Sequence, residues 1–514
     1  MAVMPHPYLP TRAVAEPWLK AGWSVPLARR LPAGAHPVAL CGRLQGSAYP
    51  FLLESARCHP VTGRYSFLGC DPSMVLRAKG RQALVELESL RALLAERAMV
   101  TLEGFPPFAG GAVGVLGYDV AHLFERLPAQ AQDDVHVPDL IVGLYETVVA
   151  FDHAVDAAWV ITRMEPGAGV TRAYDAAAGR IEAIIERLSR SPEPCGDDPS
   201  PVTDHQSPWV STHTQAGFEQ MVRQAKRWIA AGDIYQANLS QRLQAAFAGS
   251  PWDLYRCLRA VNPSPFAGYF DAGDVQLVSA SPERLVRLSH GVVDTRPIAG
   301  TWPRTGPPWQ DHRERQALIT HPKERAEHLM LVDLARNDLG RVCAYGSVAV
   351  DELMALEGYS HVFHLVSNVR GTLRPGCDWL DVVAAMVPGG TITGCPKIRS
   401  IQLIDALEPV RRQLYTGSLG YVSFTGAMDW NLVIRSAVVA GGQIYVQAGA
   451  GIVADSDPTR EYEETLHKAE ALLVALRGLP VGPRGATRPV GAGTPPVDGS
   501  GGGVEERDRA VAVG

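Results

Sequence analysis

Two pairs of glutamates with identical spacing are the first residues in this sequence that could do chemistry. Glu324 and Glu327 lie in one segment with the periodicity of a helix, and Glu461 and Glu464 lie in another. Residues three apart on a helix share a face, so each pair would present two carboxylates together. Four such carboxylates opposed across a cleft suit a hard cation such as Mg²⁺. Two solvated helix faces with Lys or Arg nearby have the same spacing, and on spacing alone they are the commoner case.

Two ionisable side chains lie in apolar, strand-like stretches. His364 stands in YSHVFHLVSNVRG, where a lone histidine is more often a satisfied core residue than a catalyst. His361, three residues earlier, breaks the alternation of a strand, so one of the two histidines is expected to point outward. Arg435 in NLVIRS requires an anion, which either a carboxylate-bearing ligand or a structural Asp or Glu would supply.

A loop of small residues, PGGTITGCPK, precedes a predicted helix at residues 398–408. Its backbone N–H groups and the N-terminus of that helix could hold a carboxylate. Cys395 in this loop has no His and Asp arranged around it in the sequence. A packing role for this cysteine is therefore favoured over a nucleophilic one.

The elements that would position these residues alternate irregularly between strand and helix. Thr214 is expected to cap one helix, and the irregular alternation lacks the βαβ rhythm of a doubly wound sheet. The sequence therefore predicts an α+β fold. Helical periodicity covers residues 82–98, 171–188, 215–231, 322–341 and 458–476, and strand patterns cover parts of 50–76 and residues 140–151, 158–163, 233–243, 276–281, 284–288, 292–295 and 443–453.

Shifts in composition divide the chain into five segments. The Pro-rich, polar stretch at residues 191–208 is the clearest internal linker, and the Gly- and Pro-rich end of the chain cannot bury a core. The expected organisation is an irregular lead-in at residues 1–36, an N-terminal lobe at 37–190, the linker at 191–208, a C-terminal lobe at 209–478 and a disordered tail at 479–514.

Composition narrows the class of protein. The 514 residues are 46% hydrophobic and 20% charged, with a formal net charge of −6, which is typical of a globular protein and gives no basic stripe for a nucleic acid. The eight cysteines form no C-x-x-C pair and suggest a reducing compartment. No secretory signal and no long apolar run is visible, so a cytoplasmic protein without a membrane span is expected.

The motifs of the C-terminal half together resemble a known family. SASPERL, DTRPIAGT, KERAEHLMLVDLARNDLGRVC, YSHVFHLVSNVRG, GGTITGCPK, YTGSLGY, MDWNLVIRS and GAGIVADSDPTREYEET occur in this order within residues 209–476. They resemble the chorismate-utilising enzymes, the family of anthranilate synthase component I and aminodeoxychorismate synthase component I. LLES, GRYSFLG and FAGGAVG extend a weaker resemblance into the N-terminal half. The resemblance implies two large antiparallel sheets packed face to face, with helices outside.

The same resemblance assigns roles to the residues singled out above. Mg²⁺ would bind the ring carboxylate of chorismate, with Glu327 and Glu464 as direct ligands and Glu324 and Glu461 acting through bound water. Glu283 of SASPER would be the general acid that protonates the departing 4-hydroxyl. The residues implied in holding the substrate are His364, beside the ring carboxylate, Thr391, which places the substrate, and Arg435, Lys468, Tyr415 and backbone groups near Gly449 and Gly451, around the enolpyruvyl carboxylate.

Gln236 in GDIYQ bears on the nucleophile. Members of the family that use water carry a lysine at this position as general base, and glutamine cannot deprotonate water. Ammonia needs no such base, so the resemblance implies an aminating enzyme. The sequence contains no G-x-C-x-G glutaminase elbow. A separate glutamine amidotransferase subunit is therefore the expected partner that supplies ammonia.

Three interpretations of the activity stay open within the family. GDIYQANLSQR, NPSPFAGYF, GGTITGCPK, YTGSLGY and MDWNLVIR resemble the aminodeoxychorismate synthases of 4-aminobenzoate and folate synthesis. Ala299 in PIAGT stands where many of these have a lysine, and this favours addition of ammonia at C2 and formation of anthranilate for tryptophan synthesis. The number of matching motifs favours the first interpretation, an aminodeoxychorismate synthase. The third interpretation is an inactive chorismate-binding subunit. LLES also resembles part of the family's tryptophan site.

Overall fold

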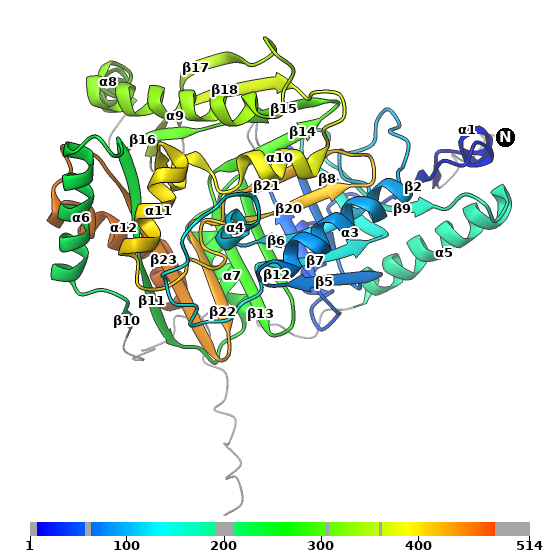
Figure 1. Ribbon diagram of the computed structural model, residues 1–514. Helices are drawn as coiled ribbons and strands as arrows, with labels where there is room; N and C mark the ends of the chain where they lie inside the picture. Colours follow the sequence, from blue (N-terminus) through cyan, green and yellow to red (C-terminus); the bar gives the residue numbers. More distant parts are fainter. Residues whose placement is uncertain (1–7, 57–62, 191–208, 304–307, 359–361, 478–514) are drawn as a thin grey trace, which may run out of the picture. The chain divides into compact units, whose positions relative to one another are not determined.

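Two antiparallel β-sheets carry the fold (Figure 1). The computed structural model describes residues 8–56, 63–190, 209–303, 308–358 and 362–477. Within these residues the larger sheet has 13 strands. Across the sheet they run in the order β1 (Tyr8–Leu9), β2 (Val25–Arg30), β9 (Ala157–Met164), β8 (Thr147–Asp152), β4 (Tyr65–Gly69), β3 (Phe51–Glu54), β12 (Phe266–Asp271), β13 (Val275–Ser281), β22 (Ser436–Ala440), β23 (Gln443–Ile452), β11 (Gln236–Ala246) and β10 (Val210–Ser211), with β19 (Gly394–Cys395) beside β11.

The smaller sheet has 10 strands among the described residues. Their order is β16 (Ile298–Pro303), β18 (Val362–Thr372), β15 (Val292–Thr295), β14 (Arg284–Ser289), β21 (Met428–Asn431), β20 (Ser418–Ser423), β6 (Gly111–Leu116), β7 (Leu140–Tyr145) and β5 (Met74–Ala78), with β17 (Ala349–Gly358) beside β18. The glycine-rich stretch of β6 is completely buried in this sheet, which agrees with its alternation of glycine and apolar residues.

Helices connect the strands and cover the sheets. Several begin at side chains suited to the purpose: the Thr214 side chain accepts a hydrogen bond from the Gly217 N–H, as predicted, and Asp378 forms a capping box. The helices are α1 (Arg12–Lys20), α2 (Pro37–Gly42), α3 (Gln82–Glu96), α4 (Ala121–Phe124), α5 (Val170–Ser189), α6 (Gln215–Ala230), α7 (Pro251–Val261), α8 (Pro308–Thr320), α9 (Pro322–Gly340), α10 (Trp379–Met386), α11 (Lys397–Leu407) and α12 (Pro458–Arg477), with 3₁₀ turns η1 (Tyr118–Val120) and η2 (Gly390–Ile392).

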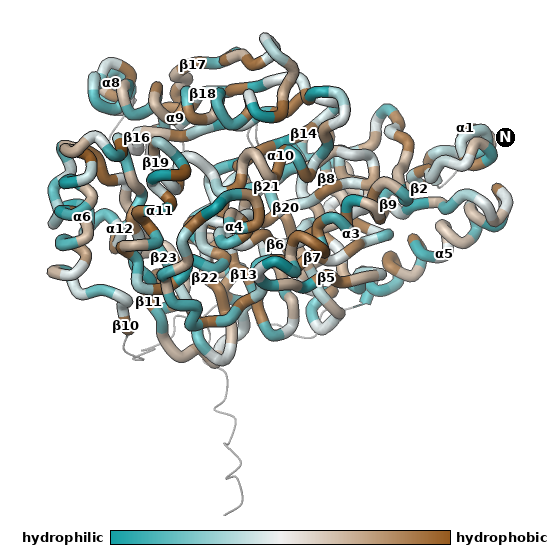
Figure 2. The backbone as a smooth tube through the Cα atoms, in the orientation of Figure 1, coloured by the Kyte–Doolittle hydropathy of each residue, from teal (hydrophilic) through white to brown (hydrophobic). Residues whose placement is uncertain are grey.

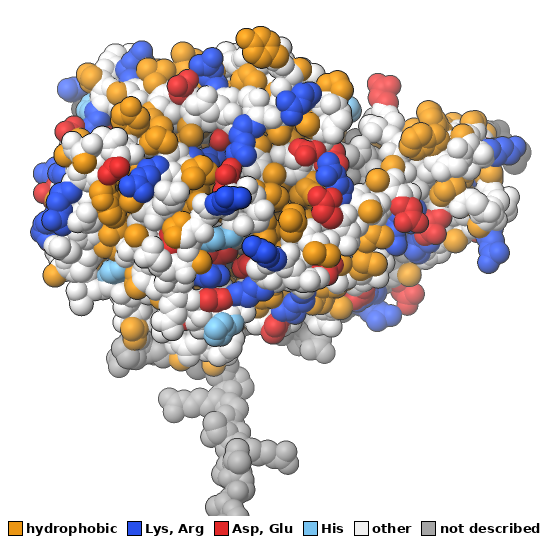
Figure 3. Space-filling model, in the orientation of Figure 1, with side chains coloured by type: hydrophobic (Ala, Val, Ile, Leu, Met, Phe, Trp, Pro, Cys, Tyr) orange, Lys and Arg blue, Asp and Glu red, His pale blue; other side chains and the backbone are white. Residues whose placement is uncertain are grey.

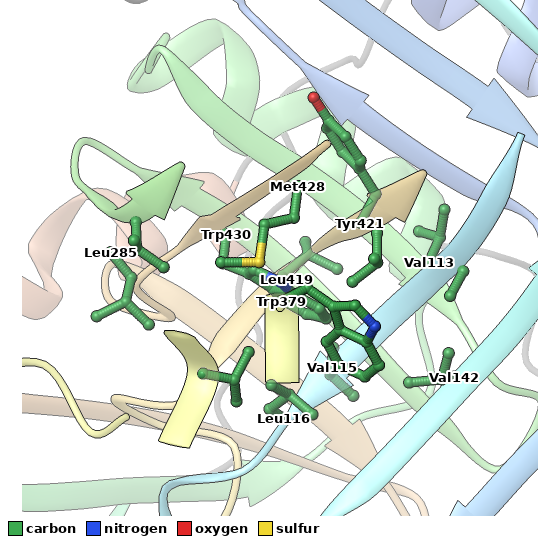
Figure 4. Close-up of a cluster of buried hydrophobic side chains, with 14 of the residues drawn as sticks. Val113, Val115, Leu116, Val142, Leu285, Trp379, Leu419, Tyr421, Met428 and Trp430 are labelled. Carbon is green, nitrogen blue, oxygen red and sulfur yellow. The ribbon is translucent and has the colours of Figure 1, made fainter. Parts of the chain in front are cut away.

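A hydrophobic core fills the space between the two sheets. Phe67 of β4 meets Tyr421 of β20 with ring centroids 5.5 Å apart, and both belong to one continuous buried cluster. The face-to-face packing of two antiparallel sheets in an α+β fold is therefore confirmed. Figure 2 shows hydrophobic residues gathered in the central strands and hydrophilic ones on outer helices such as α6. Figure 4 shows part of this core, from Val113, Val115, Leu116, Val142, Leu285, Trp379, Leu419, Tyr421, Met428 and Trp430.

Each sheet joins a block of strands from the N-terminal half of the chain to a block from the C-terminal half. β12 pairs with β3, which places Ala267 opposite Glu54, and β20 pairs with β6, which places Leu419 opposite Val115. The lobes predicted at residues 37–190 and 209–478 therefore share their sheets and fall in one unit. Local periodicity reports strands but not their partners, so it could not show this. The predicted linker at 191–208 and tail at 479–514 lie outside the described residues.

The prediction of an irregular lead-in at residues 1–36 was wrong for most of that segment. Residues 8–30 form β1, α1 and β2, and β2 extends the larger sheet by pairing with β9, where Leu27 lies opposite Thr162. Pro17 lies inside α1, where proline normally disfavours a helix, and this composition concealed the helix. Ala15 and Leu19 of α1 are buried, so tertiary packing stabilises an element whose local propensity is low.

Candidate active site

The two acidic pairs lie on helices that influence each other electrostatically. Glu327 of α9 is half-buried, and burial raises the pKa of its carboxyl group. Lys323 lowers this pKa, whereas the three carboxylates of Glu324, Glu461 and Glu464 each raise it further. One carboxylate raises the pKa of another only when the two are close together. The acidic pairs of α9 and α12 therefore lie near each other.

The four carboxylates do not form a compact cluster in the described part of the chain. In the described part of the chain, no group of three or more His, Cys, Asp or Glu side chains is arranged to hold a metal ion. The donor chemistry nevertheless fits Mg²⁺, because the side chains are oxygen donors whose mutual repulsion a divalent cation would relieve. Burial also raises the pKa of Glu461, with Glu464 adding to the effect and Ser456 opposing it. The assignment of Glu327 and Glu464 as direct ligands, with Glu324 and Glu461 acting through bound water, stays a prediction.

Glu283 lies in the tight connection between β13 and β14, where its side chain is buried. The Thr391 hydroxyl, from η2, donates a hydrogen bond of 2.8 Å to Glu283 Oε1, and the backbone of Ile298 contributes a second hydrogen bond. Burial outweighs these two bonds and raises the pKa of Glu283 to about 7. A carboxyl group with such a pKa is substantially protonated at neutral pH and can act as a general acid.

Gly300 joins the predicted histidine to the first acidic pair. It occupies an irregularity in β16 with φ +63°, and a Cβ at this position would lie 2.8 Å from Glu324 Oε2. His364 of β18 hydrogen-bonds the Gly300 backbone. The pKa of His364 is lowered to about 4, mainly by burial, with Arg435 contributing and the bond to Gly300 opposing the shift, so the imidazole is neutral at pH 7. Ala299, the neighbour of Gly300 in β16, is half-buried at the same place.

The cationic side chains form the next part of the site. Lys468 of α12 pairs with Glu464 at 2.6 Å and donates a hydrogen bond of 2.9 Å to the Gly449 carbonyl. Arg435 Nη1 donates to the Lys468 carbonyl over 2.8 Å. Burial lowers the pKa of Arg435, an effect that Tyr415 and Glu464 oppose. These contacts connect β23 and α12. Arg435 and Lys468 remain able to bind an anionic ligand.

The glycines of β23 give close approach to three polar side chains. A Cβ on Gly449 would lie 3.0 Å from the Tyr415 hydroxyl and 2.6 Å from Asn238 Oδ1, and one on Gly451 would lie 2.7 Å from Gln236 Nε2. Burial raises the pKa of Tyr415 to about 12, so its hydroxyl remains a hydrogen-bond donor. Glycine is thus required at both positions because any side chain would fill the space beside these groups.

These contacts link nearly all of the predicted site residues in one network. Its first part joins Glu283 and Thr391, through Ile298 and the Ala299–Gly300 segment, to Glu324 and His364. Its second part is centred on Arg435 and Lys468 and includes Glu464, Gly449, Tyr415, Gly451 and Gln236. Glu327 and Glu461 join it electrostatically. His361 lies outside the described residues.

Two residues near the site were not predicted. Asn238 follows Gln236 by two positions in β11, and the period of a strand places both on one face, so this alternation was a usable signal. Lys397 forms a buried ion pair of 2.5 Å with Asp338, which joins α11 to α9, and Asp338 lines a small cavity together with Thr391. Nothing local in the sequence reveals such a pair. Cys395 belongs to strand β19, which pairs with β11. Burial raises the pKa of its thiol, so this cysteine is not a preformed thiolate nucleophile.

A cavity of about 1050 Å³ lies beside the LLES motif. Leu53, Glu54 and Ser55 line it together with Phe266, and the Glu54 carboxylate accepts a hydrogen bond of 2.6 Å from Tyr255. None of the predicted catalytic, substrate or metal residues belongs to its described lining, so it is separate from the network above. On the face that Figure 3 shows, Lys and Arg side chains are interspersed with Asp and Glu.

Comparison with known proteins shows the family of this chain. Residues 49–474 match the family described as chorismate binding enzyme, and the chain belongs to that family. It is 42% identical to anthranilate synthase component 1 of Streptomyces coelicolor over 478 residues, which cover 91% of this chain and 92% of the relative. It is 40% identical to aminodeoxychorismate synthase component 1 of Bacillus subtilis over 446 residues, or 84% and 92% of the two chains.

Solved structures show the same fold. The crystal structure of anthranilate synthase component I from Streptococcus pneumoniae superposes with a TM-score of 0.70 and 34% sequence identity, over 81% of this chain and 93% of that one. No helix among the described residues has the length and apolar character needed to cross a bilayer.

Proposed function

We propose that this protein is the synthase component of a magnesium-dependent enzyme that aminates chorismate. The observation that carries this proposal is the network itself, which brings a protonated acid, two cations and two acidic pairs together in a chorismate-binding fold. Glu327 and Glu464 would hold Mg²⁺, with Glu324 and Glu461 in support. When bound, the cation withdraws electron density through the ring carboxylate of chorismate, so that the ring diene accepts a nucleophile more readily.

The residues of this chain supply the other requirements of the reaction. Arg435, Lys468 and Tyr415 lie around Gly449 and would bind a carboxylate there, and His364 would contact the ring-carboxylate side of the substrate, as the family resemblance implies. Hydroxide is a poor leaving group, and Glu283 supplies the proton that lets the 4-hydroxyl depart as water. The hydrogen bond from Thr391 holds Glu283 Oε1 in position and links it to the loop PGGTITGCPK.

Ammonia is the nucleophile that the site supports best. Gln236 faces Gly451 in the position where the family's water-using members carry a basic lysine, and an amide cannot remove a proton from water. A separate glutamine amidotransferase subunit would generate the ammonia. The names of the relatives, which are component 1 of two-component synthases, support such a partner.

We propose aminodeoxychorismate synthesis as the specific activity, with the product serving 4-aminobenzoate and folate synthesis. The motifs around Gln236, Thr391, Tyr415 and Arg435 support it, because each resembles the corresponding motif of that branch. The two curated relatives do not separate the branches, since their identities to this chain are 42% and 40%.

Ala299 supports a second candidate, anthranilate synthesis. It lies beside Gly300 in the network, where a lysine in many aminodeoxychorismate synthases is thought to add to the ring. Without that lysine, ammonia would add directly at C2, and the product would lead to anthranilate.

Product identification tests these proposals. The purified chain is incubated with chorismate, Mg²⁺ and ammonium chloride, with and without aminodeoxychorismate lyase. Formation of 4-aminobenzoate only when the lyase is added supports the first candidate, whereas fluorescent anthranilate without lyase supports the second. Absence of any chorismate loss would instead identify an inactive binding subunit.

A further inference from the structure

Lys397 and Asp338 form an ion pair inside the protein, outside the set of residues assigned to the substrate or the metal. Lys397 Nζ is 2.5 Å from Asp338 Oδ2, and the two residues are only 7% and 6% exposed. Burial raises the pKa of the Asp338 carboxyl group, and the charge of Lys397 opposes this shift. Removing two charges from water costs free energy that their attraction barely repays, so an apolar pair would stabilise the fold about as well. The feature that distinguishes the ion pair from an apolar pair is its fixed geometry.

The Lys397 ammonium group connects the two ends of the loop PGGTITGCPK, residues 388–397. Lys397 is the last residue of this loop and the first residue of α11. Its Nζ also donates a hydrogen bond of 3.4 Å to the carbonyl of Met386, the last residue of α10, which precedes the loop. Asp338 belongs to the last turn of α9. One ammonium group therefore ties both ends of the loop to each other and to α9.

Further contacts hold the middle of the loop against the same helix. Gly390 packs so closely on Leu334 of α9 that a Cβ at this glycine would collide with the leucine side chain. The Thr393 hydroxyl donates a hydrogen bond of 2.8 Å to the Gly389 carbonyl, which closes the turn around Thr391. The position of Thr391 therefore depends on how the loop is fixed to α9.

Glu283, Thr391 and Asp338 line one small cavity. It has a volume of about 20 Å³, enough for a single water molecule. Besides Glu283, the charged residues of its described lining are Arg284 of β14 and Asp338 of α9, and both are engaged in ion pairs. The hydrogen bond of 2.8 Å from Thr391 to Glu283 Oε1 is therefore the interaction through which a change at the loop would reach the Glu283 carboxyl group.

We propose that the Lys397–Asp338 ion pair is a clamp that holds Thr391 in hydrogen-bonding position on the Glu283 carboxyl group. Lys397 and Asp338 are then positioning residues, which act on the acid through Thr391 and touch no substrate. This inference rests on the proposed function, in which Glu283 is the proton donor, and it adds the residues that keep the donor oriented. It also explains why charged side chains occupy a place that an apolar pair could fill.

The dependence of kcat on pH tests the clamp in the full chain, assayed with chorismate, ammonium chloride and Mg²⁺. Lys397→Met combined with Asp338→Leu replaces the ion pair by apolar side chains, so no buried charge is left unpaired. Thr391 then loses its fixed position, and its stabilising hydrogen bond to the Glu283 carboxylate weakens. The alkaline limb of kcat is expected to move to higher pH by roughly 0.5 to 1 pH unit, the effect of one hydrogen bond, while KM for chorismate stays near the wild-type value.

A second background separates positioning from a general effect of packing. In a chain that already carries Thr391→Val, replacement of the ion pair should move the limb no further, because the hydrogen bond that the clamp maintains is absent. Arg336→Met removes an exposed ion pair of 3.0 Å with Asp333 on the same helix and is the control, with the limb at its wild-type pH. If the apolar variant does not fold, Lys397→Gln gives the same comparison, because it keeps a donor for Asp338 on a shorter side chain.

A limb that stays at the wild-type pH when the ion pair is replaced would overturn the proposal, and so would a shift of equal size with and without Thr391→Val. A rise in KM for chorismate that accompanies the shift would also overturn it, by showing a general distortion. Infrared difference spectra between chains with Glu283 and with Glu283→Gln titrate this carboxyl group without turnover. If the wild-type chain consumes no chorismate, the proposed function fails, whereas these spectra, recorded with and without the ion pair, still decide whether the clamp acts on Glu283.

Discussion

The Thr391 hydroxyl donates a hydrogen bond of 2.8 Å to the Glu283 carboxylate, across 108 positions of sequence. This bond joins the glycine-rich turn η2 to the β13–β14 connection and fixes the one carboxyl group in the site whose pKa is raised to about 7 by burial. The bond therefore affects both the orientation of the Glu283 carboxyl group and its pKa, and the two effects can be measured separately.

Removal of the acid is expected to stop proton donation without loss of the substrate site. Glu283→Gln keeps the size of the side chain and can still accept the Thr391 hydrogen bond. We expect kcat to fall roughly 100- to 10,000-fold, the usual contribution of a general acid. Chorismate binding, measured by fluorescence titration with Mg²⁺ present, should stay near wild type. A variant with more than a tenth of the wild-type kcat would show that Glu283 is not the proton donor.

The dependence of rate on pH should report the pKa of Glu283. The acid acts in its protonated form, so kcat should decline as pH rises through about 7. The hydrogen bond from Thr391 lowers this pKa, because it stabilises the carboxylate. Thr391→Val removes the bond, so the pKa should rise and the alkaline limb of the profile should move to higher pH. A limb that stays in place, or moves to lower pH, contradicts this assignment.

The four glutamates should differ in their effect on magnesium. Glu327→Gln and Glu464→Gln each remove a proposed ligand and should abolish Mg²⁺-dependent turnover. Glu324→Gln and Glu461→Gln should weaken Mg²⁺ affinity by roughly 10- to 100-fold, as is usual for residues that support the ligands. Calorimetric titration of Mg²⁺ in the presence of chorismate gives these affinities. Glu463→Gln, which is exposed on α12 between the two α12 glutamates, is the matched control and should bind as wild type.

A side chain at Gly300 should affect both stability and the metal. Gly300 has φ +63°, and a Cβ there would lie 2.8 Å from Glu324 Oε2, whereas Gly273 has φ +85° and no atom within 4 Å of its Cβ position. Either Gly→Ala change should cost about 1 to 2 kcal/mol in free energy of unfolding for the left-handed backbone. Only Gly300→Ala should also weaken Mg²⁺ binding, because it displaces Glu324. Equal Mg²⁺ affinities in the two variants would separate Gly300 from the acidic pair.

Local pattern predicted much of the fold and of the site. The spacing of Glu324 with Glu327 and of Glu461 with Glu464 placed each pair on a helix, and α9 and α12 begin and end close to the predicted positions. The strands on either side of Glu283 were likewise visible from their alternation. Motifs of this kind act over a few residues, so their signal is contained in the local sequence.

Relationships between distant residues were not accessible in the same way. The pairing of β3 with β12 and the ion pair of Lys397 with Asp338 depend on tertiary packing, which no local periodicity encodes. Helix α1 was missed because Pro17 lowers its local propensity, while packing of Ala15 and Leu19 stabilises it. Asn238 could have been found from its two-residue spacing to Gln236, but only the structure shows that its side-chain oxygen is buried and has no hydrogen-bond partner among the described residues.

The central claim is that this chain catalyses addition of ammonia to chorismate under the control of a divalent cation. The most direct measurement is mass spectrometry of the products formed from chorismate and ¹⁵N-ammonium chloride, with Mg²⁺ or with excess EDTA. The account predicts loss of chorismate and one labelled nitrogen in the product with Mg²⁺, and neither with EDTA. Unlabelled products, or equal turnover without the cation, would contradict it.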